Sequence, residues 1–170
     1  MTTDIAVSIA PDLGANFKAA MRRLAATVTI ITAKEGDACH GMTATAVTSL
    51  TATPPSILAC VNQTASIHHP IGNSGQYCIN LLGCDHSDLV SLFSGKLSGE
   101  ERFTSGTWAK NDEGIPYLAD AQANIFCTVV NTIKHESHTI FIGRVDEVFV
   151  QGKTSPLLYQ EGTLYRSMAL

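Results

Sequence analysis

The sequence lacks a long apolar run and lacks an excess of basic residues. No window reaches the roughly 18 consecutive apolar residues of a transmembrane helix, and the first ten residues include Asp4 instead of the basic stretch that opens a secretion signal. Lys and Arg total 11 against 15 Asp and Glu, for a net charge of −4. No basic block is present to neutralise a phosphate backbone. We therefore expect a cytoplasmic protein that binds neither membrane nor nucleic acid.

Several motifs that would define a reaction are also missing. None of the 13 glycines forms a GxG triplet, which excludes the glycine-rich fingerprint of a Rossmann dinucleotide site. No GxSxG marks a hydrolase nucleophile, and the five cysteines include no CxxC pair. His135-Glu136-Ser137-His138 places its second histidine one position too early for the zinc motif of a helix. We expect no metal site, and we expect the cysteines to be reduced thiols.

The composition suits a single domain. A chain of 170 residues with 45% hydrophobic content can bury a substantial core without disulfides or metals. Residues 1–15 show no sustained period and are expected to form a loose arm before one domain at 16–170. An amphipathic helix is expected from Asn16, because apolar residues recur at helical spacing at Phe17, Ala20, Met21 and Leu24.

Apolar and β-branched runs bounded by turn residues predict a mainly β fold with a few helices. The strand-like runs lie at residues 28–33, 41–51, 56–62, 77–82, 123–134, 139–150, 157–159 and 164–166. Short helices are expected at 66–72 and after Asp85, which is a plausible cap. Residues 94–116 should form a long loop with a short helix. Six or seven short strands with few helices are typical of a barrel.

The segment from Gly41 to Leu50 is the most informative for chemistry. It carries small residues and hydroxyls at nearly every position, including Thr43, Ala44, Thr45 and Ala46. Such a strand leaves its backbone accessible, so a flat ring with polar edges could hydrogen-bond to main-chain groups. The alternative is a threonine-rich edge strand whose hydroxyls face water.

A second candidate segment runs from Asn62 to Ser66. It follows a strand and enters an expected helix, where free backbone N–H groups can bind a phosphate. Ser66 could also serve as a helix N-cap, and the two interpretations are compatible. Phe93-Ser94-Gly95 and Arg102 place an aromatic ring and a cation around the long loop.

The chain carries a series of motifs in a fixed order between about Phe17 and Tyr165. They are residues 41–46, 49–55, Cys60-Val61-Asn62 with Ser66, Phe93-Ser94-Gly95, residues 100–103, Trp108, and residues 137–139 and 157–159. Together they resemble the short-chain flavin reductases that supply reduced flavin to two-component monooxygenases. That family is typified by the reductase component of 4-hydroxyphenylacetate 3-monooxygenase.

The resemblance implies an FMN-binding split β-barrel that forms a homodimer, with the flavin in a groove near the subunit interface. It implies that the ring edge meets Thr43, Ala44, Thr45 and Ala46. The ribityl phosphate region would be held by Ser49, Asn62 and Ser66, in a segment that also includes Cys60 and Val61. The loops expected to touch the nucleotide carry Phe93, Ser94, Gly95 and Arg102. Two further candidates are Tyr165, which would close the flavin site, and His138, the catalytic candidate near the nicotinamide.

The expected reaction is hydride transfer from NADH or NADPH to FMN or FAD, after which reduced flavin leaves for a partner flavin-dependent oxygenase. The flavin and the nicotinamide carry this chemistry, so no nucleophile triad is required. No arginine cluster marks a 2′-phosphate, which favours NADH. Two alternatives stay open. One is a reductase that retains its flavin and reduces another acceptor, such as cob(II)yrinate diamide or ferric iron, and the other is a noncatalytic flavin-binding module.

Overall fold

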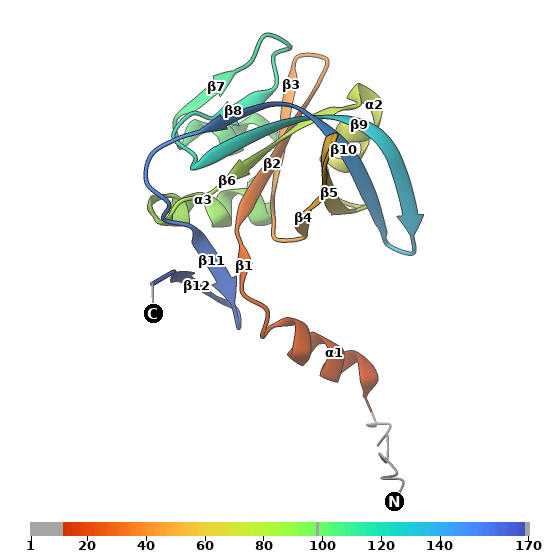
Figure 1. The fold of residues 1–170 in the computed structure, drawn as a ribbon, viewed down its shortest axis with the longest axis vertical. Coiled ribbons are helices and arrows are strands. Elements are labelled where there is room, and N and C mark those ends of the chain that lie inside the picture. The colour runs from red at the N-terminus through yellow and green to blue at the C-terminus, as the bar shows by residue number, and fades with distance from the viewer. Residues whose placement is uncertain (1–11, 98, 169–170) are drawn as a thin grey trace, which may run out of the picture.

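The computed structural model describes residues 12–97 and 99–168, and its centre is a seven-stranded antiparallel sheet (Figure 1). The strand order is β3-β2-β6-β9-β10-β5-β4. The bounds are β2 Thr29–Glu35, β3 Ala38–Ala44, β4 Val47–Ala52, β5 Pro55–Asn62, β6 Gln76–Leu81, β9 Ala123–His135 and β10 His138–Val150. The expected mainly β fold is confirmed. The outer strands β3 and β4 are not paired with each other, so the sheet is not closed into a barrel.

The remaining elements surround this sheet. A small sheet combines β1 Ala26–Thr27, β11 Leu157–Gln160 and β12 Thr163–Arg166, and a two-stranded ribbon combines β7 Trp108–Lys110 and β8 Pro116–Leu118. The helices are α1 Leu13–Met21, α2 His68–Ser74 and α3 Ser87–Ser91, with short helical turns at Cys84–His86, Leu92–Lys96 and Gly99–Thr104. Among the described residues, no helix has the length and apolar character to span a membrane.

Strand β2 lies inside the molecule because both of its faces are covered. Ile31 packs in one apolar cluster with Tyr77, Ile79 and Phe141. Ile30 packs in a second cluster with residues of α3 and β8. A strand buried on both faces is an almost continuous apolar run, which explains why residues 28–33 lack polar alternation.

Helix α1 differs from the expected helix at both ends. It begins at Leu13, where Asp12 Oδ1 accepts a hydrogen bond from Ala15 N at 2.9 Å, and it ends at Met21. The start expected at Asn16 was therefore too late, because the Asp12 cap was not recognised. The rest of the predicted arm, residues 1–11, lies outside the described residues. Helix α1 projects away from the sheets and has no buried side chain (Figure 1).

Two other helix starts were predicted wrongly. Helix α2 begins at His68 and has no side-chain cap, so Ser66 is not its N-cap. The preceding turn is closed instead by Asn62, whose Oδ1 accepts from Thr64 N at 2.9 Å. Near Asp85, Gly83 N donates to Nδ1 of His86 at 3.0 Å, and α3 starts only after this turn. In both places a side chain in the preceding turn accepts a hydrogen bond from a backbone N–H group before the helix begins.

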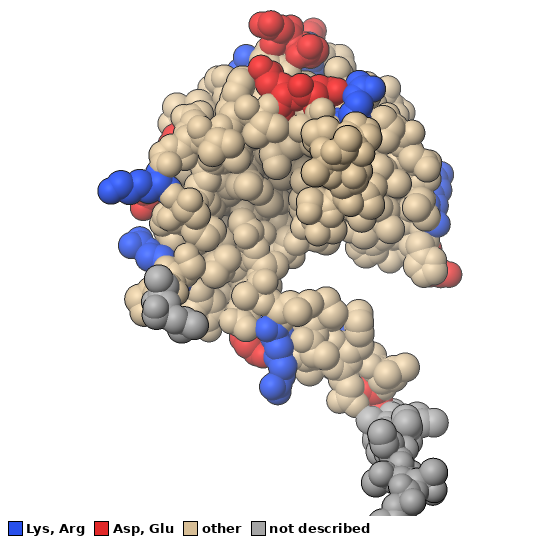
Figure 2. All heavy atoms as spheres, in the orientation of Figure 1, with Lys and Arg blue, Asp and Glu red and all other residues tan. Residues whose placement is uncertain are grey.

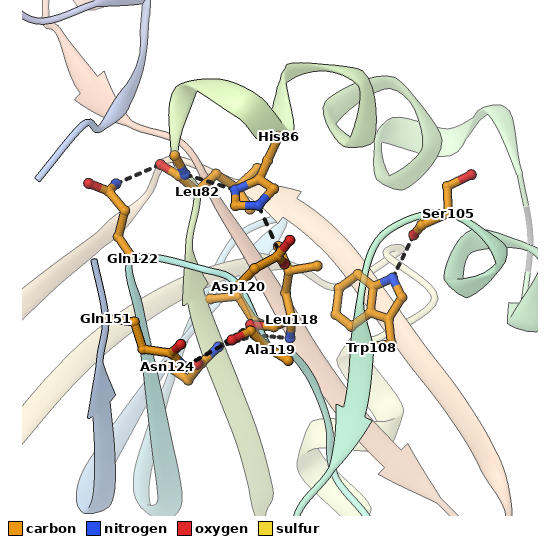
Figure 3. A network of polar contacts seen from close by, with 12 residues as sticks. Leu82, His86, Ser105, Trp108, Leu118, Ala119, Asp120, Gln122, Asn124 and Gln151 are labelled. Atoms are coloured by element: carbon orange, nitrogen blue, oxygen red, sulfur yellow. Dashed lines mark hydrogen bonds and ion pairs between the residues drawn. The ribbon is translucent and has the colours of Figure 1, made fainter. Parts of the chain in front are cut away.

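Side-chain contacts at one end of the sheet connect the turn before α3 with the neighbouring loops (Figure 3). Nε2 of His86 lies 3.5 Å from Oδ1 of Asp120, and Nε2 of Gln122 donates to Leu82 O at 2.8 Å. Nearby, Nε1 of Trp108 donates to Ser105 O at 2.7 Å. These bonds fix the turn before α3, and therefore also the start of the segment that carries Phe93.

Candidate functional site

The link between β3 and β4 borders a cavity. The expected strand at 41–51 is interrupted at Thr45 and Ala46, which are exposed. Ala46 O accepts a hydrogen bond from Cys60 N at 2.9 Å, so the link is tied to β5. The cavity has a volume of about 280 Å³ and is lined by Thr45, Ala46, Val47, Thr48, Leu58, Cys60 and Ile140. Its walls are mainly apolar, which suits a flat heterocycle.

A buried cation lies against the middle of β3. Arg102 is only 9% exposed, and its Nε donates to Leu97 O at 2.7 Å. Its Nη1 donates to Gly41 O and lies 3.4 Å from Oγ of Ser66. Within the described part of the chain, no carboxylate forms an ion pair with Arg102. Buried charges are normally paired, so this guanidinium is suited to hold an anion beside Ser66.

Phe93 is a packing residue next to this cation. Its side chain is 2% exposed, and its ring centroid lies 5.3 Å from those of Phe103 and Trp108. Ser94 Oγ donates to Val90 O at 2.6 Å, and Gly95 has a φ of +102°, which favours glycine. This segment therefore shapes the loop around Arg102.

Asn62 and His138 lie side by side. The two residues are opposite each other in the ladder between β5 and β10. His138 is exposed, and its Nδ1 lies 2.9 Å from Oγ of Ser137. Gln63 bridges the strands, because its Nε2 donates to His138 O at 3.2 Å. The structure thus brings the catalytic candidate next to the segment predicted to bind phosphate.

The other residues predicted for the site do not line the cavity beside Ala46. Ser49 is opposite Ile57 and lines a different cavity, so the structure does not bring it next to Asn62 or Ser66. Tyr165 is opposite Leu158 in the small sheet and is 46% exposed. Two side chains face the interior, with exposed fractions of 8% for Ala44 and 0% for Val61. Thr43 Oγ1 donates to Val90 O at 3.1 Å.

His68 is a residue of this region that the sequence argument missed. Its Nε2 lies 2.9 Å from Oγ1 of Thr139, and its buried Nδ1 has no partner among the described residues. Burial, together with the charges of His69 and Lys134, lowers the pKa of His68. His68 and His69 begin α2, and Pro70 follows in its first turn. Proline is tolerated in the first turn of a helix, so Pro70 was the available signal.

Cys78 and Cys127 are buried thiols without the features of reactive cysteines. All five cysteines are free. Burial raises the pKa of Cys127 to about 12 and also raises the pKa of Cys78. A thiol that stays protonated is a poor nucleophile and a poor metal ligand. Cys60 is half-buried at the cavity beside Ala46, where it contributes an apolar wall.

Comparisons with known proteins show which family the chain belongs to. Residues 21–167 match the family model described as a flavin reductase like domain. The reductase component of an FADH(2)-dependent resorcinol hydroxylase from Rhizobium sp. (strain MTP-10005) is 44% identical over 156 residues, which cover 90% of this chain and 87% of that protein. An NADH-dependent FMN reductase, RutF 1, from Methylorubrum extorquens is 36% identical, covering 95% of this chain and 80% of that protein.

A solved structure agrees with these relatives. The flavin reductase PheA2 in its native state superposes with a TM-score of 0.83 at 32% identity, covering 92% of this chain and 99% of PheA2. The chain belongs to the flavin reductase like domain family. The family expected from the sequence motifs is thereby confirmed.

Proposed function

We propose that the protein is an NADH-dependent flavin reductase that transfers a hydride from NADH to FMN or FAD and supplies the reduced flavin to a partner flavin-dependent monooxygenase. The observation that carries this proposal is membership of the flavin reductase family over residues 21–167. Its relatives are named as an NADH-dependent FMN reductase and as the reductase component of a hydroxylase. The first name gives NADH and FMN as reactants, and the second gives a reductase that serves an FADH(2)-dependent hydroxylase.

The residues at the site fit a flavin. The cavity beside Thr45 and Ala46 offers apolar walls for a ring system and the hydroxyl-bearing residues Thr45 and Thr48 at its lining. Arg102 supplies a buried positive charge with no carboxylate partner in the described ranges, close to Oγ of Ser66. A flat ring at the first position and a phosphate at the second are the chemical features of a flavin nucleotide.

We assign roles to the chain's own residues on this basis. Residues 43–46 and Cys60 border the ring, while Asn62, Ser66 and Arg102 bind the phosphate region. His138 lies beside Asn62, where it can donate a hydrogen bond to the nucleotide. Residues 93–95 support Arg102. Ser49 and Tyr165 remain candidates on the family resemblance alone, because neither lines the cavity beside Ala46.

The protein's contribution to the reaction is alignment and electrostatics. The flavin and the nicotinamide supply the hydride chemistry when they are bound. Ala46 O in the link accepts a hydrogen bond from Cys60 N, which ties this edge of the cavity to β5. Arg102 is held by two carbonyl groups and can bind an anion without reorganising. Such preorganisation lowers the entropic cost of bringing two rings together.

The proposal is tested by measuring NADH oxidation at 340 nm with purified protein, with and without added FMN or FAD. We expect oxidation only when flavin is present. Folded protein that shows no flavin-dependent oxidation would contradict the proposed function. Gel filtration of protein loaded with flavin then separates two modes of action. A flavin that dissociates on the column supports delivery to an oxygenase, whereas a retained flavin indicates reduction of another acceptor.

We also propose the finer architecture expected from the sequence. The edge strands β3 and β4 are consecutive in the sequence but are not paired with each other, so we infer a barrel that is split between them. We propose a homodimer, because the β9 and β10 strands expose Val130, Ile133, Val148 and Val150. Light scattering should give a mass near twice 18.1 kDa, and a mass near that of the monomer would contradict the dimer. Location in the cytoplasm also stays a proposal.

A further inference from the structure

The hairpin of β9 and β10 projects from the body of the molecule, and Figure 2 shows its tip standing clear of α1. Strand β9 is paired with β6 up to Thr128, and its residues from Asn131 to His135 are paired with β10. The other side of β10 is paired with β5 from His138 to Arg144. The position of His138 therefore depends on the contacts between the start of β10 and the end of β5.

Two side chains of the turn between β5 and α2 contact the start of β10. At the first end of this turn, Nε2 of Gln63 donates to His138 O at 3.2 Å. At the other end, Nε2 of His68 lies at hydrogen-bond distance, 2.9 Å, from Oγ1 of Thr139. Residues 63–68 are thus attached to the hairpin at both ends, and Ser66 lies between the two attachments.

The imidazole of His68 packs against β10. Its partner Thr139 is only 1% exposed, and the ring of His68 lies 5.4 Å from that of Phe141 in an edge-on arrangement. Nδ1 of His68 is buried and has no hydrogen-bond partner among the described residues. Burial and the charges of His69 and Lys134 lower the pKa of His68, so its ring is neutral at about pH 8. The hydrogen bond to Thr139 is therefore made by an uncharged ring.

This hydrogen bond gives the turn its direction next to Ser66. Ile67 is fully buried and holds the turn on the core, but apolar packing is not directional. The bond between His68 and Thr139 is directional, because a hydrogen bond weakens steeply when its angle changes. Oγ of Ser66 lies 3.4 Å from Nη1 of Arg102. A rotation of the turn would move Ser66 away from this guanidinium.

We propose that His68 is a positioning residue, which holds Ser66 beside Arg102 through its hydrogen bond to Thr139. The inference rests on the proposed function, which places the flavin phosphate at Ser66 and Arg102. His68 acts through Ser66 and makes no contact of its own with the flavin. Its loss should therefore affect flavins that carry a phosphate and spare flavins that do not.

The test compares FMN with riboflavin, which lacks the phosphate, at about pH 8. Dissociation constants are measured by flavin fluorescence. We expect His68→Leu to weaken FMN binding roughly three- to tenfold, corresponding to the loss of one hydrogen bond, and to leave riboflavin binding unchanged. His68→Gln can still donate to Thr139 and should keep most of the FMN affinity. The matched control is His69→Leu, because His69 is the exposed neighbour of His68 in α2.

A double variant separates positioning from stability. His68→Leu alone removes the partner of the buried Thr139 hydroxyl, which lowers the urea midpoint. His68→Leu combined with Thr139→Val removes both polar partners, so the urea midpoint should return toward that of the parent. The FMN affinity of the double variant should stay as low as that of His68→Leu, since the directional bond is still absent.

The outcomes are distinct. Equal weakening of FMN and riboflavin, or no change in either, overturns the inference, as does the same loss in His68→Gln or His69→Leu. A double variant that regains FMN affinity along with stability also overturns it, because His68 would then serve the stability of the fold alone. A parent protein that binds FMN no better than riboflavin overturns the phosphate position and this inference together. A parent that prefers FMN but shows no flavin-dependent NADH oxidation contradicts only the proposed function.

Discussion

A Cβ atom placed on Gly41 would lie 2.6 Å from Cε1 of Phe93. The same Cβ would lie 3.3 Å from Cζ of Phe103, so two aromatic rings close over this point of β3. Gly41 O also accepts the hydrogen bond from Nη1 of Arg102. The missing side chain thus lets the loop approach the strand closely enough for the cation to reach the proposed phosphate position. Gly41 is required for a close approach, and not for an unusual backbone conformation.

The first prediction concerns this contact. Gly41→Ala should lower the free energy of unfolding by about 1–3 kcal/mol, because a methyl group would overpack the site against Phe93. It should also weaken FMN binding by displacing Arg102. Urea unfolding and FMN titration measure the two effects. The control is Gly72→Ala in α2, where an added Cβ meets nothing within 4 Å and should not destabilise the protein. Equal stability of the two variants would show that the loop yields without cost.

The second prediction concerns the buried guanidinium. Arg102→Gln should weaken FMN binding about tenfold, which corresponds to the loss of a hydrogen bond to a charged group. Arg102→Lys keeps the charge but loses the planar fork that bonds to Leu97 O and Gly41 O. We therefore expect its FMN affinity to lie between those of the parent and Arg102→Gln. If all three proteins bind FMN equally, Arg102 is a purely structural cation.

The third prediction concerns pH and His68. The pKa of His68 is lowered in the folded protein, mainly by burial, from an ordinary value of 6.5. The unfolded chain therefore binds more protons below this pH. The stabilising contribution of neutral His68 is fully present above about pH 6.5 and decreases as the pH falls through the lowered folded-state pKa.

Unfolding experiments between pH 5 and 8 measure this effect as a change in urea midpoint with pH. His68→Gln removes the titrating group while keeping a side chain able to hydrogen-bond to Thr139. The pH dependence of its stability should be flatter than that of the parent at the acid end. Identical pH profiles for the two proteins would contradict the assignment of the acid-side loss to His68.

The sequence predicted the strands better than the contacts between them. The runs at 28–33, 56–62 and 77–82 match β2, β5 and β6 closely, because β-branched and apolar residues bounded by turns are a local signal. The division of 41–51 into β3 and β4 has no such signal. It depends on β3 pairing with β2 while β4 pairs with β5, which is decided by tertiary structure.

For the candidate site as well, the sequence indicated segments but not the contacts between them. The resemblance to a family indicated candidate segments at Thr45, Asn62 and Arg102, but it did not separate exposed side chains from those that face the core. Val61 lies in a matching motif and yet is 0% exposed, because alternate residues of β5 point inward. The contact between Arg102 and Gly41 joins residues far apart in the chain, and no local pattern encodes it.

The fourth prediction tests His138. His138→Asn should lower kcat/KM for NADH on the order of tenfold, corresponding to the loss of one hydrogen bond to the nucleotide. The dissociation constant of FMN should change little. The matched control is His135→Asn, because His135 is exposed and is paired with His138 across the β9 and β10 hairpin. Similar losses in both variants would point to a disturbed hairpin instead of a lost contact to the nucleotide.

The fifth prediction tests the phosphate position at Ser66. Ser66→Asp should weaken FMN binding by at least tenfold, because the carboxylate would pair with the nearby guanidinium of Arg102 and repel the phosphate. Riboflavin has no phosphate and should bind the variant about as well as the parent. Ser66 is exposed and does not cap α2, so the free energy of unfolding should change little. Ser66→Asn, which adds similar bulk without charge, separates the electrostatic effect from a steric one. If Ser66→Asp binds FMN and riboflavin as the parent does, the phosphate must bind elsewhere, and the roles assigned to Ser66 and Arg102 are wrong.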